Sequence, residues 1–201
     1  IAAGFKLAQA FLGPRTQSHS DPPPQLSSAL AQVLESLFTG MNRMASIWQR
    51  LRGSEPVPAF GVDLRAVAES PAADVQPMIE SFRLGYRNLQ EVWSVVLPPA
   101  TLLELKKLAA RSDDGFRFAD TLWARIVYDF ALAHRTRAMD RNHLLQAMTP
   151  LYLGWVASYA LQVRDADALG VEQRIEALCM AYEAEKGYLI SRWRWPDRFN
   201  P

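Results

Sequence analysis

The sequence predicts a mainly α-helical fold, with about six helices preceded by one strand and a polar loop. Between residues 26 and 193, apolar side chains recur at steps of three and four, the spacing of one face of a helix. Residues 5–12 instead alternate between two faces and end at Gly13-Pro14, as a mostly buried strand before a turn does. The 201 residues are 49% hydrophobic, which is enough for a substantial core in one or two domains.

The strand at residues 5–12 has no partner in the predicted pattern. A single strand is not stable alone, and no nearby segment has the pattern of a second one. We therefore expect the rest of its sheet to be encoded upstream of Ile1. On this basis residues 1–25 are the last strand and loop of a larger domain. Residues 26–201 form a helical C-terminal domain with a loop at about residues 53–74.

Six apolar stripes define the predicted helices. They span residues 26–51, 75–96, 98–108, 118–130, 144–163 and 171–193. The Pro98-Pro99 pair stops the second helix and opens the third, because proline is tolerated in the first turn. Asp140 is the expected cap of the fifth helix. Pro150 is expected to kink that helix, since it removes a backbone donor and crowds the preceding turn.

The overall charge sets limits on the partners. A formal net charge of +1 gives no field that would attract nucleic acid or acidic membranes. Local basic clusters are expected to be solvated helix ends. Residues 144–163 are long and apolar enough to be tested as a membrane span, but their polar side chains favour a core or subunit-interface helix. We expect a cytoplasmic homo-oligomer. We do not expect it to bind nucleic acid or a membrane.

Local catalytic signatures are missing from the sequence. It has no Gly-rich phosphate loop, no His-Glu-x-x-His pattern, no cysteine pair and no Gly-x-Ser-x-Gly elbow. Cys179 lies at an apolar helical spacing and is predicted to be a small core residue. His134 and His143 are predicted to be surface or capping histidines. Trp193 and Trp195 are predicted to hold the chain end against the helices, rather than to form a stacking surface, because Trp193 continues an apolar stripe.

His19 differs from the other histidines. It lies in a Pro-rich loop just past the C-terminal end of the predicted strand, with Arg15 before it and Asp21 after it. Ligands bind at the carboxyl ends of strands in open α/β sheets, so His19 is a candidate ligand residue.

Several stretches of the chain resemble glucosyl-3-phosphoglycerate synthases and the related mannosylglycerate synthase type of retaining bacterial glycosyltransferase. The similar stretches are residues 11–15, 85–90, 97–101, 122–130, 149–154 and 192–201, so the resemblance covers essentially the whole chain. It implies that residues 1–25 close a nucleotide-sugar-binding catalytic domain with a glycosyltransferase A-type fold. The helical remainder would be the C-terminal domain of such an enzyme.

The resemblance also implies a reaction. Such enzymes move a hexose from a nucleotide diphosphate sugar to glycerate, phosphoglycerate or a similar small acceptor, with retention at the anomeric carbon. A divalent metal, Mg or Mn, neutralises the diphosphate leaving group. Its Asp-x-Asp-type ligands would lie in the upstream catalytic domain.

Three loop residues carry the implied site. Arg15 matches a basic residue that helps to hold the diphosphate. Gln17 stands where the metal-binding histidine is expected, and His19 follows two residues later. Because an amide oxygen is a weaker ligand than imidazole for a transition metal, three possibilities stay open. The loop is reshaped so that His19 reaches the metal, this member binds the metal weakly, or it has lost activity.

The sequence thus predicts the C-terminal segment of a nucleotide-sugar-dependent glycosyltransferase. It would supply a donor-site loop and a helical scaffold or oligomerisation surface, and we do not expect the 201 residues alone to be active. The alternative is a stand-alone helical interaction or dimerisation module without catalysis, and a peripheral membrane bundle ranks third.

Overall fold

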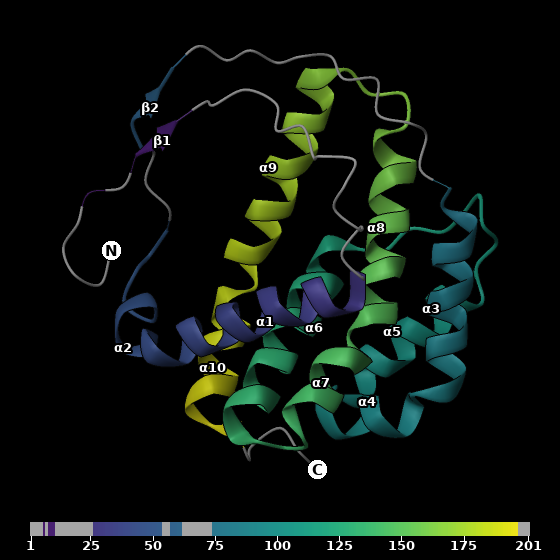
Figure 1. Cartoon of the computed structure of the whole chain (residues 1–201), viewed down its shortest axis with the longest axis horizontal. Helices are drawn as coiled ribbons and strands as arrows, with labels where there is room; N and C mark the ends of the chain where they lie inside the picture. The colour runs from purple at the N-terminus through teal and green to yellow at the C-terminus, as the bar shows by residue number, and fades with distance from the viewer. Residues whose placement is uncertain (1–5, 7, 11–25, 54–56, 62–73, 197–201) are drawn as a thin grey trace, which may run out of the picture.

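The computed structural model describes residues 6, 8–10, 26–53, 57–61 and 74–196. These residues form a mainly helical body with a minor two-stranded parallel sheet (Figure 1). The elements are β1 (Gln9–Ala10), α1 (Leu26–Arg43), α2 (Ala45–Trp48), β2 (Ala59–Phe60), α3 (Gln76–Asn88), α4 (Gln90–Val96), α5 (Pro99–Ala109), α6 (Asp120–Thr136), α7 (Arg141–Ala147), α8 (Thr149–Val163), α9 (Ala168–Ala184) and α10 (Lys186–Arg194). The prediction of a mainly helical fold is confirmed.

Helix α6 lies at the centre of the body. Ten of its 17 residues are buried, because α1, α4, α5, α7, α9 and α10 all contact it. Its apolar side chains, such as Ile126 and Phe130, lie in one continuous core with Phe38 of α1 and Leu144 of α7. Burial of this kind contributes about 1.5 to 3 kcal/mol for each large apolar side chain.

Four of the six predicted helices are each divided in two. The breaks fall at Met44, Leu89, Met148 and Glu185, where the chain turns between α1 and α2, α3 and α4, α7 and α8, and α9 and α10. The kink expected at Pro150 is found as the break at Met148, in the turn that precedes this proline, and Pro150 itself lies in the first turn of α8, where proline is tolerated. The apolar spacing continues across such breaks and does not reveal them. Asp140 does cap α7, accepting a hydrogen bond from the His143 amide at 3.0 Å.

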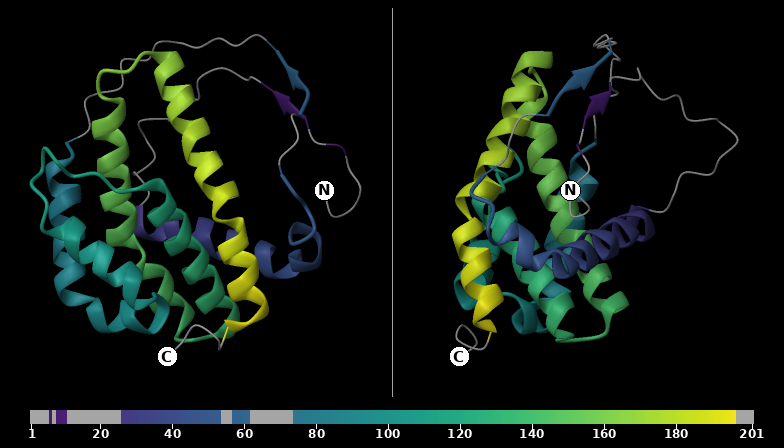
Figure 2. Two further views of the ribbon diagram at one scale, coloured as in Figure 1. Left: turned by 180° about the vertical axis from the view of Figure 1, so that it is seen from behind. Right: turned by 90° about the vertical axis from the view of Figure 1, so that its left-hand side faces the viewer.

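The strand near the N-terminus has a partner within this chain. β1 pairs in parallel with β2, with Gln9 opposite Ala59 and Ala10 opposite Phe60. The prediction that residues 53–74 hold no strand is wrong, because a two-residue strand has no periodicity to detect. The four paired residues are exposed, whereas the sequence predicted a mostly buried strand. Figures 1 and 2 show the pair standing apart from the helices.

The C-terminal helices confirm one core prediction and overturn another. Trp193 is buried and packs edge to face on Trp48, so it holds α10 against α2, whereas Trp195 is 60% exposed and does not pack in the core. Cys179 is exposed and is not a core residue. The reason is that α9 packs on one side only and has no buried residue. No helix in the described ranges has the length and apolar character needed to cross a bilayer.

Helices α3 and α8 approach closely through two glycines. A Cβ added at Gly154 would lie 2.9 Å from the ring of Phe82, and one added at Gly85 would collide with Pro150. Both glycines are buried. Any larger residue at either position would force these two helices apart.

We therefore predict that Gly154→Ala lowers the free energy of unfolding by about 1 to 3 kcal/mol, the usual cost of overpacking a core. Urea denaturation followed by circular dichroism measures the change. Gly187→Ala in α10 is the matched control, because a Cβ there meets no atom within 4 Å. The control should leave stability unchanged or raise it by up to about 1 kcal/mol. Equal effects of the two substitutions would contradict the close packing of α3 and α8.

Candidate functional site

The three residues predicted from the sequence as donor or metal ligands, Arg15, Gln17 and His19, lie outside the described residues. Their roles stay predictions. Among the residues that the structure does describe, no group of three or more His, Cys, Asp or Glu side chains could hold a metal ion. Within the described part of the chain, polar side chains gather in a cleft between two helices and, separately, in the core.

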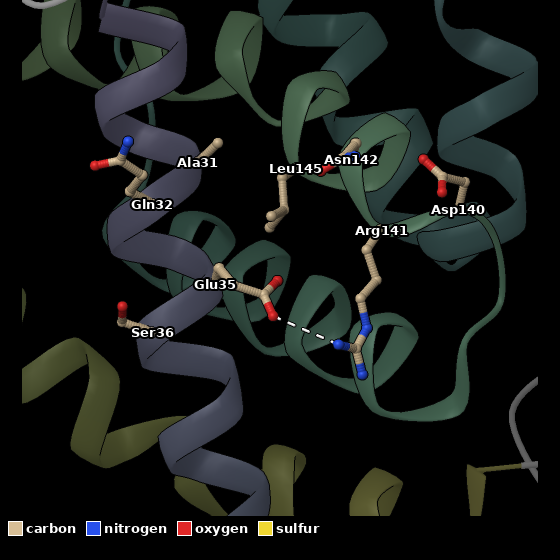
Figure 3. Close-up of a pocket in the computed structure, with 8 residues that line it drawn as sticks. All are labelled: Ala31, Gln32, Glu35, Ser36, Asp140, Arg141, Asn142 and Leu145. Atoms are coloured by element: carbon tan, nitrogen blue, oxygen red, sulfur yellow. Dashed lines mark ion pairs between the residues drawn. The ribbon is translucent and has the colours of Figure 1, made fainter.

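The first cluster lines a cleft of about 770 Å³ between α1 and α7. Figure 3 shows Glu35 and Arg141 reaching toward each other from the two helices. The cleft is lined by Ala31, Gln32, Glu35, Ser36, Asp140, Arg141, Asn142 and Leu145. Its walls combine apolar side chains with amide, carboxylate and guanidinium groups, so it can hydrogen-bond a small polar molecule.

The carboxylate of Glu35 is hydrogen-bonded to a buried histidine of α6. His134 Nε2 lies 2.8 Å from Glu35 Oε2, and the His134 side chain is only 2% exposed. The prediction that His134 is a surface or capping histidine is wrong, because α1 covers the last turn of α6. The hydrogen bond from His134 lowers the pKa of Glu35, so this side chain is a carboxylate at neutral pH.

Arg141 completes the cluster more loosely. Its Nη1 atom lies 3.5 Å from Glu35 Oε1, and its side chain is about half exposed. Thr39 donates a long hydrogen bond of 3.4 Å to the same carboxylate oxygen. The cleft therefore presents a carboxylate oxygen beside a guanidinium group, and both remain accessible. No side chain lining it has the nucleophile and base arrangement of a covalent catalyst.

The second cluster is a buried ion pair between α6 and α10. Asp129 Oδ1 lies 2.8 Å from Arg192 Nε, and the two side chains are 0% and 8% exposed. The Tyr188 hydroxyl lies 2.9 Å from each Asp129 oxygen. Burial raises the pKa of Asp129 from 3.8 to about 7, against the opposing effects of Arg192 and Tyr188. The buried carboxylate of Asp129 thus joins α6 to α10, through a residue 63 positions later in the sequence.

A second ion pair extends this cluster toward the surface. Arg125 Nε donates to Glu185 Oε2 at 2.7 Å, and the Arg125 guanidinium also lies over the Tyr188 ring, 5.2 Å from its centroid. Glu185 is the residue at the break between α9 and α10. The Arg125–Glu185 pair therefore attaches the junction of α9 and α10 to α6. Buried polar groups with this many partners act as structural links between helices, not as free reactive groups.

Sequence reasoning missed Glu35, Asp129 and Arg192. Asp129 did carry a signal, because it lies between Ile126 and Phe130 in a stretch that is otherwise apolar on the core side. A charged residue at such a position requires a buried partner. The identity of that partner, 63 residues later, depends on how α10 packs on α6.

Comparisons of the chain with protein-family models, with curated proteins and with solved structures found no match.

Replacing only Arg192 of the buried Asp129–Arg192 pair should lower the free energy of unfolding more than replacing both residues. We expect Arg192→Met to lower the free energy of unfolding by about 3 to 5 kcal/mol, because it leaves the Asp129 carboxylate buried without its cation. The double variant Asp129→Leu with Arg192→Met should lose less than Arg192→Met alone. A double-mutant cycle by urea denaturation measures the coupling. Strictly additive losses would show that the pair is not coupled.

Asp129 also predicts a pH dependence of stability. Its folded pKa, about 7, lies above the ordinary value of 3.8, so the folded state binds a proton more tightly than the unfolded state. The contribution of Asp129 to the free energy of unfolding is therefore largest below pH 4 and is lost as the pH rises toward 7. Between these pH values the free energy of unfolding should change with a slope that reaches about −1.4 kcal/mol per pH unit. Unfolding curves of the wild type and of the double variant, compared between pH 4 and 8, isolate this slope. No difference in slope would contradict it.

Proposed function

We propose that this chain is the C-terminal, mainly helical portion of a nucleotide-sugar-dependent glycosyltransferase. The enzyme would transfer a hexose to a small acceptor such as glycerate or phosphoglycerate, with retention at the anomeric carbon. Residues 1–25 would supply a donor-site loop, and the helical body would support the catalytic part. The resemblance of residues 11–15 and of the helical stretches to retaining bacterial glycosyltransferases motivates this proposal.

The resembling stretches include the helix contacts described above. Residues 85–90 and 149–154 contain Gly85, Pro150 and Gly154, which lie where α3 meets α8. Residues 122–130 lie within α6, the central helix. These stretches therefore carry the packing of the helical body, in agreement with a role for it as a scaffold.

The observation that carries the proposal furthest is the pair β1 and β2. The two strands are parallel and are joined through α1 and α2, as in a strand–helix–strand unit. Parallel sheets in stable domains are covered on both faces, and two short strands alone are marginal. Here the paired residues are exposed, and Phe60 is 62% exposed. In our proposal these strands belong to a larger sheet of the catalytic part, which covers them.

A divalent metal, Mg or Mn, would assist the reaction by neutralising the diphosphate of the donor. The described residues do not supply its ligands. In the proposal His19 or Gln17 binds the metal together with carboxylates of the upstream catalytic part, and Arg15 holds the diphosphate. Imidazole and carboxylate groups are suitable ligands for Mn, and carboxylates for Mg.

A helical interaction or dimerisation module is the second candidate. The exposed apolar side chains of α1, among them Val33 at 64% and Leu37 at 46%, favour it. The two candidates differ in one measurable property. A transferase binds a nucleotide sugar, whereas an interaction module does not.

Calorimetric titration of the full natural chain that contains these residues tests the proposal. Uridine and guanosine diphosphate hexoses are added with and without Mn or Mg. We expect metal-dependent binding of one donor. Absence of binding in every combination would leave the interaction module as the better account.

The same titration separates the two candidate metal residues. We expect His19→Ala to weaken metal-dependent donor binding at least tenfold, since it removes a metal ligand, and Gln17→Ala to have a much smaller effect. Arg15→Ala should also weaken binding of the donor in the presence of metal, because it removes the cation proposed to hold the diphosphate. Equal and negligible effects at His19 and Gln17 would refute the assignment of His19.

A further inference from the structure

Helices α9 and α10 form a nearly continuous C-terminal arm, residues 168–194, in which Glu185 alone separates the two helices. Figures 1 and 2 show the arm along one side of the body. Little apolar burial holds it there: α9 has no buried residue, and the buried residues of the arm are Glu185, Leu189, Arg192 and Trp193. Because two of these residues carry charges, polar contacts make up much of the attachment.

Three ion pairs join the arm to α6. They are Asp120 with Arg174 at 2.6 Å, Arg125 with Glu185 at 2.7 Å and Asp129 with Arg192 at 2.8 Å. Along α6 the charges are negative, positive and negative, and along the arm they are positive, negative and positive. The partners follow each other in the same order in both segments. Displacing the arm by one pair brings like charges together, so the three pairs specify one register.

The ion pairs specify the position of the arm more than they stabilise it. When an ion pair opens to water, both charges regain their hydration, which offsets much of the lost attraction. Apolar side chains that separate have no such compensation. The apolar side chains that the arm buries are Leu189 and Trp193, whereas ten of the 17 residues of α6 are buried. Separating the arm from the body therefore requires less free energy than unfolding the body.

The two helices of the arm are attached to the same element. The Tyr182 carbonyl oxygen in α9 accepts a hydrogen bond from the Tyr128 hydroxyl at 2.9 Å, and the Trp193 carbonyl oxygen in α10 accepts one from Arg135 Nη1 at 2.6 Å. Both donors lie on α6, as do the partners in the three ion pairs. Because no loop intervenes between α9 and α10, a displacement of one helix from α6 carries the other with it.

Opening of the arm changes the surface beside it. The arm forms one wall of a groove of about 510 Å³ through Tyr182, Glu183, Lys186 and Leu189, and α1, α2 and Leu51 form the other. We propose that the C-terminal arm separates from α6 as one unit while the rest of the body stays folded, and that the three ion pairs return it to a single register. Separation removes one wall of the groove, so the arm controls access to the apolar surface of α1 and α2. This device does not depend on the proposed transferase activity.

Native-state amide hydrogen exchange of the full natural chain, at increasing urea below the unfolding transition, tests the separation. We expect the amides of α9 and α10 to exchange through one shared opening, about tenfold or more faster than the amides of α6. The urea dependence of this opening should be smaller than that of global unfolding, because it exposes less surface. Exchange of the arm only together with α6 would overturn the proposal.

Two substitutions test whether the arm responds as one unit. Arg174→Gln removes the ion pair at the α9 end of the arm. Arg174 contacts Asp120, Gln162 and Tyr159, which all lie outside α10. We expect this substitution, and Glu185→Gln at the junction, to speed the exchange of both arm helices about tenfold.

Glu104→Gln is the matched control. It removes an ion pair with Lys107 that lies within α5, so it should leave the exchange of the arm unchanged. Faster exchange confined to α9 in Arg174→Gln, or an equal effect of the control, would contradict the shared opening.

Discussion

The helical body depends on how the buried carboxylate of Asp129 is satisfied. The Asp129 side chain of α6 is fully buried, so its carboxylate cannot reach water. An isolated buried charge costs several kcal/mol, and the contacts with Arg192 and Tyr188 of α10 offset part of this cost. The same arrangement places Glu185 against Arg125 and Trp193 against Trp48. Together these contacts hold α9, α10 and α2 against the central helix and its neighbours.

The class of fold and most helical stripes could be predicted from the sequence, because apolar spacing reports which residues share a helix face. The breaks at Met44, Leu89 and Glu185 could not, since the spacing continues across them, whereas Pro150 indicated the break at Met148. The pairing of β1 with β2 was also missed. Two residues per strand carry no periodicity, and the register depends on how the intervening helices return the chain.

The candidate sites were less predictable than the fold. His134 lies at a helix end, where the sequence suggests solvent, and only the packing of α1 on α6 buries it against Glu35. Cys179 shows the opposite case, because its apolar spacing suggests a core that α9 does not enter. Both errors arise because a sequence stripe shows which residues share a face but not whether another element covers that face. Arg15, Gln17 and His19 lie outside the described residues, and their assignment depends on the family resemblance.

The proposed function joins these observations in one account. The helical body is held by the contacts of α6 and by the close packing of α3 on α8. It carries an exposed strand pair that stands apart from the helices (Figure 1). In the proposal, the catalytic part of a glycosyltransferase covers these strands.

Amide hydrogen exchange in the full natural chain tests the central claim, that β1 and β2 belong to a larger covered sheet. The diagnostic group is the Gln9 amide, which donates to the Pro58 carbonyl oxygen at 2.8 Å. The account predicts that this amide is protected to a degree comparable with the amides of α6, because a covered sheet opens only with the domain. Exchange of the Gln9 amide at the rate of an unstructured peptide would contradict the claim.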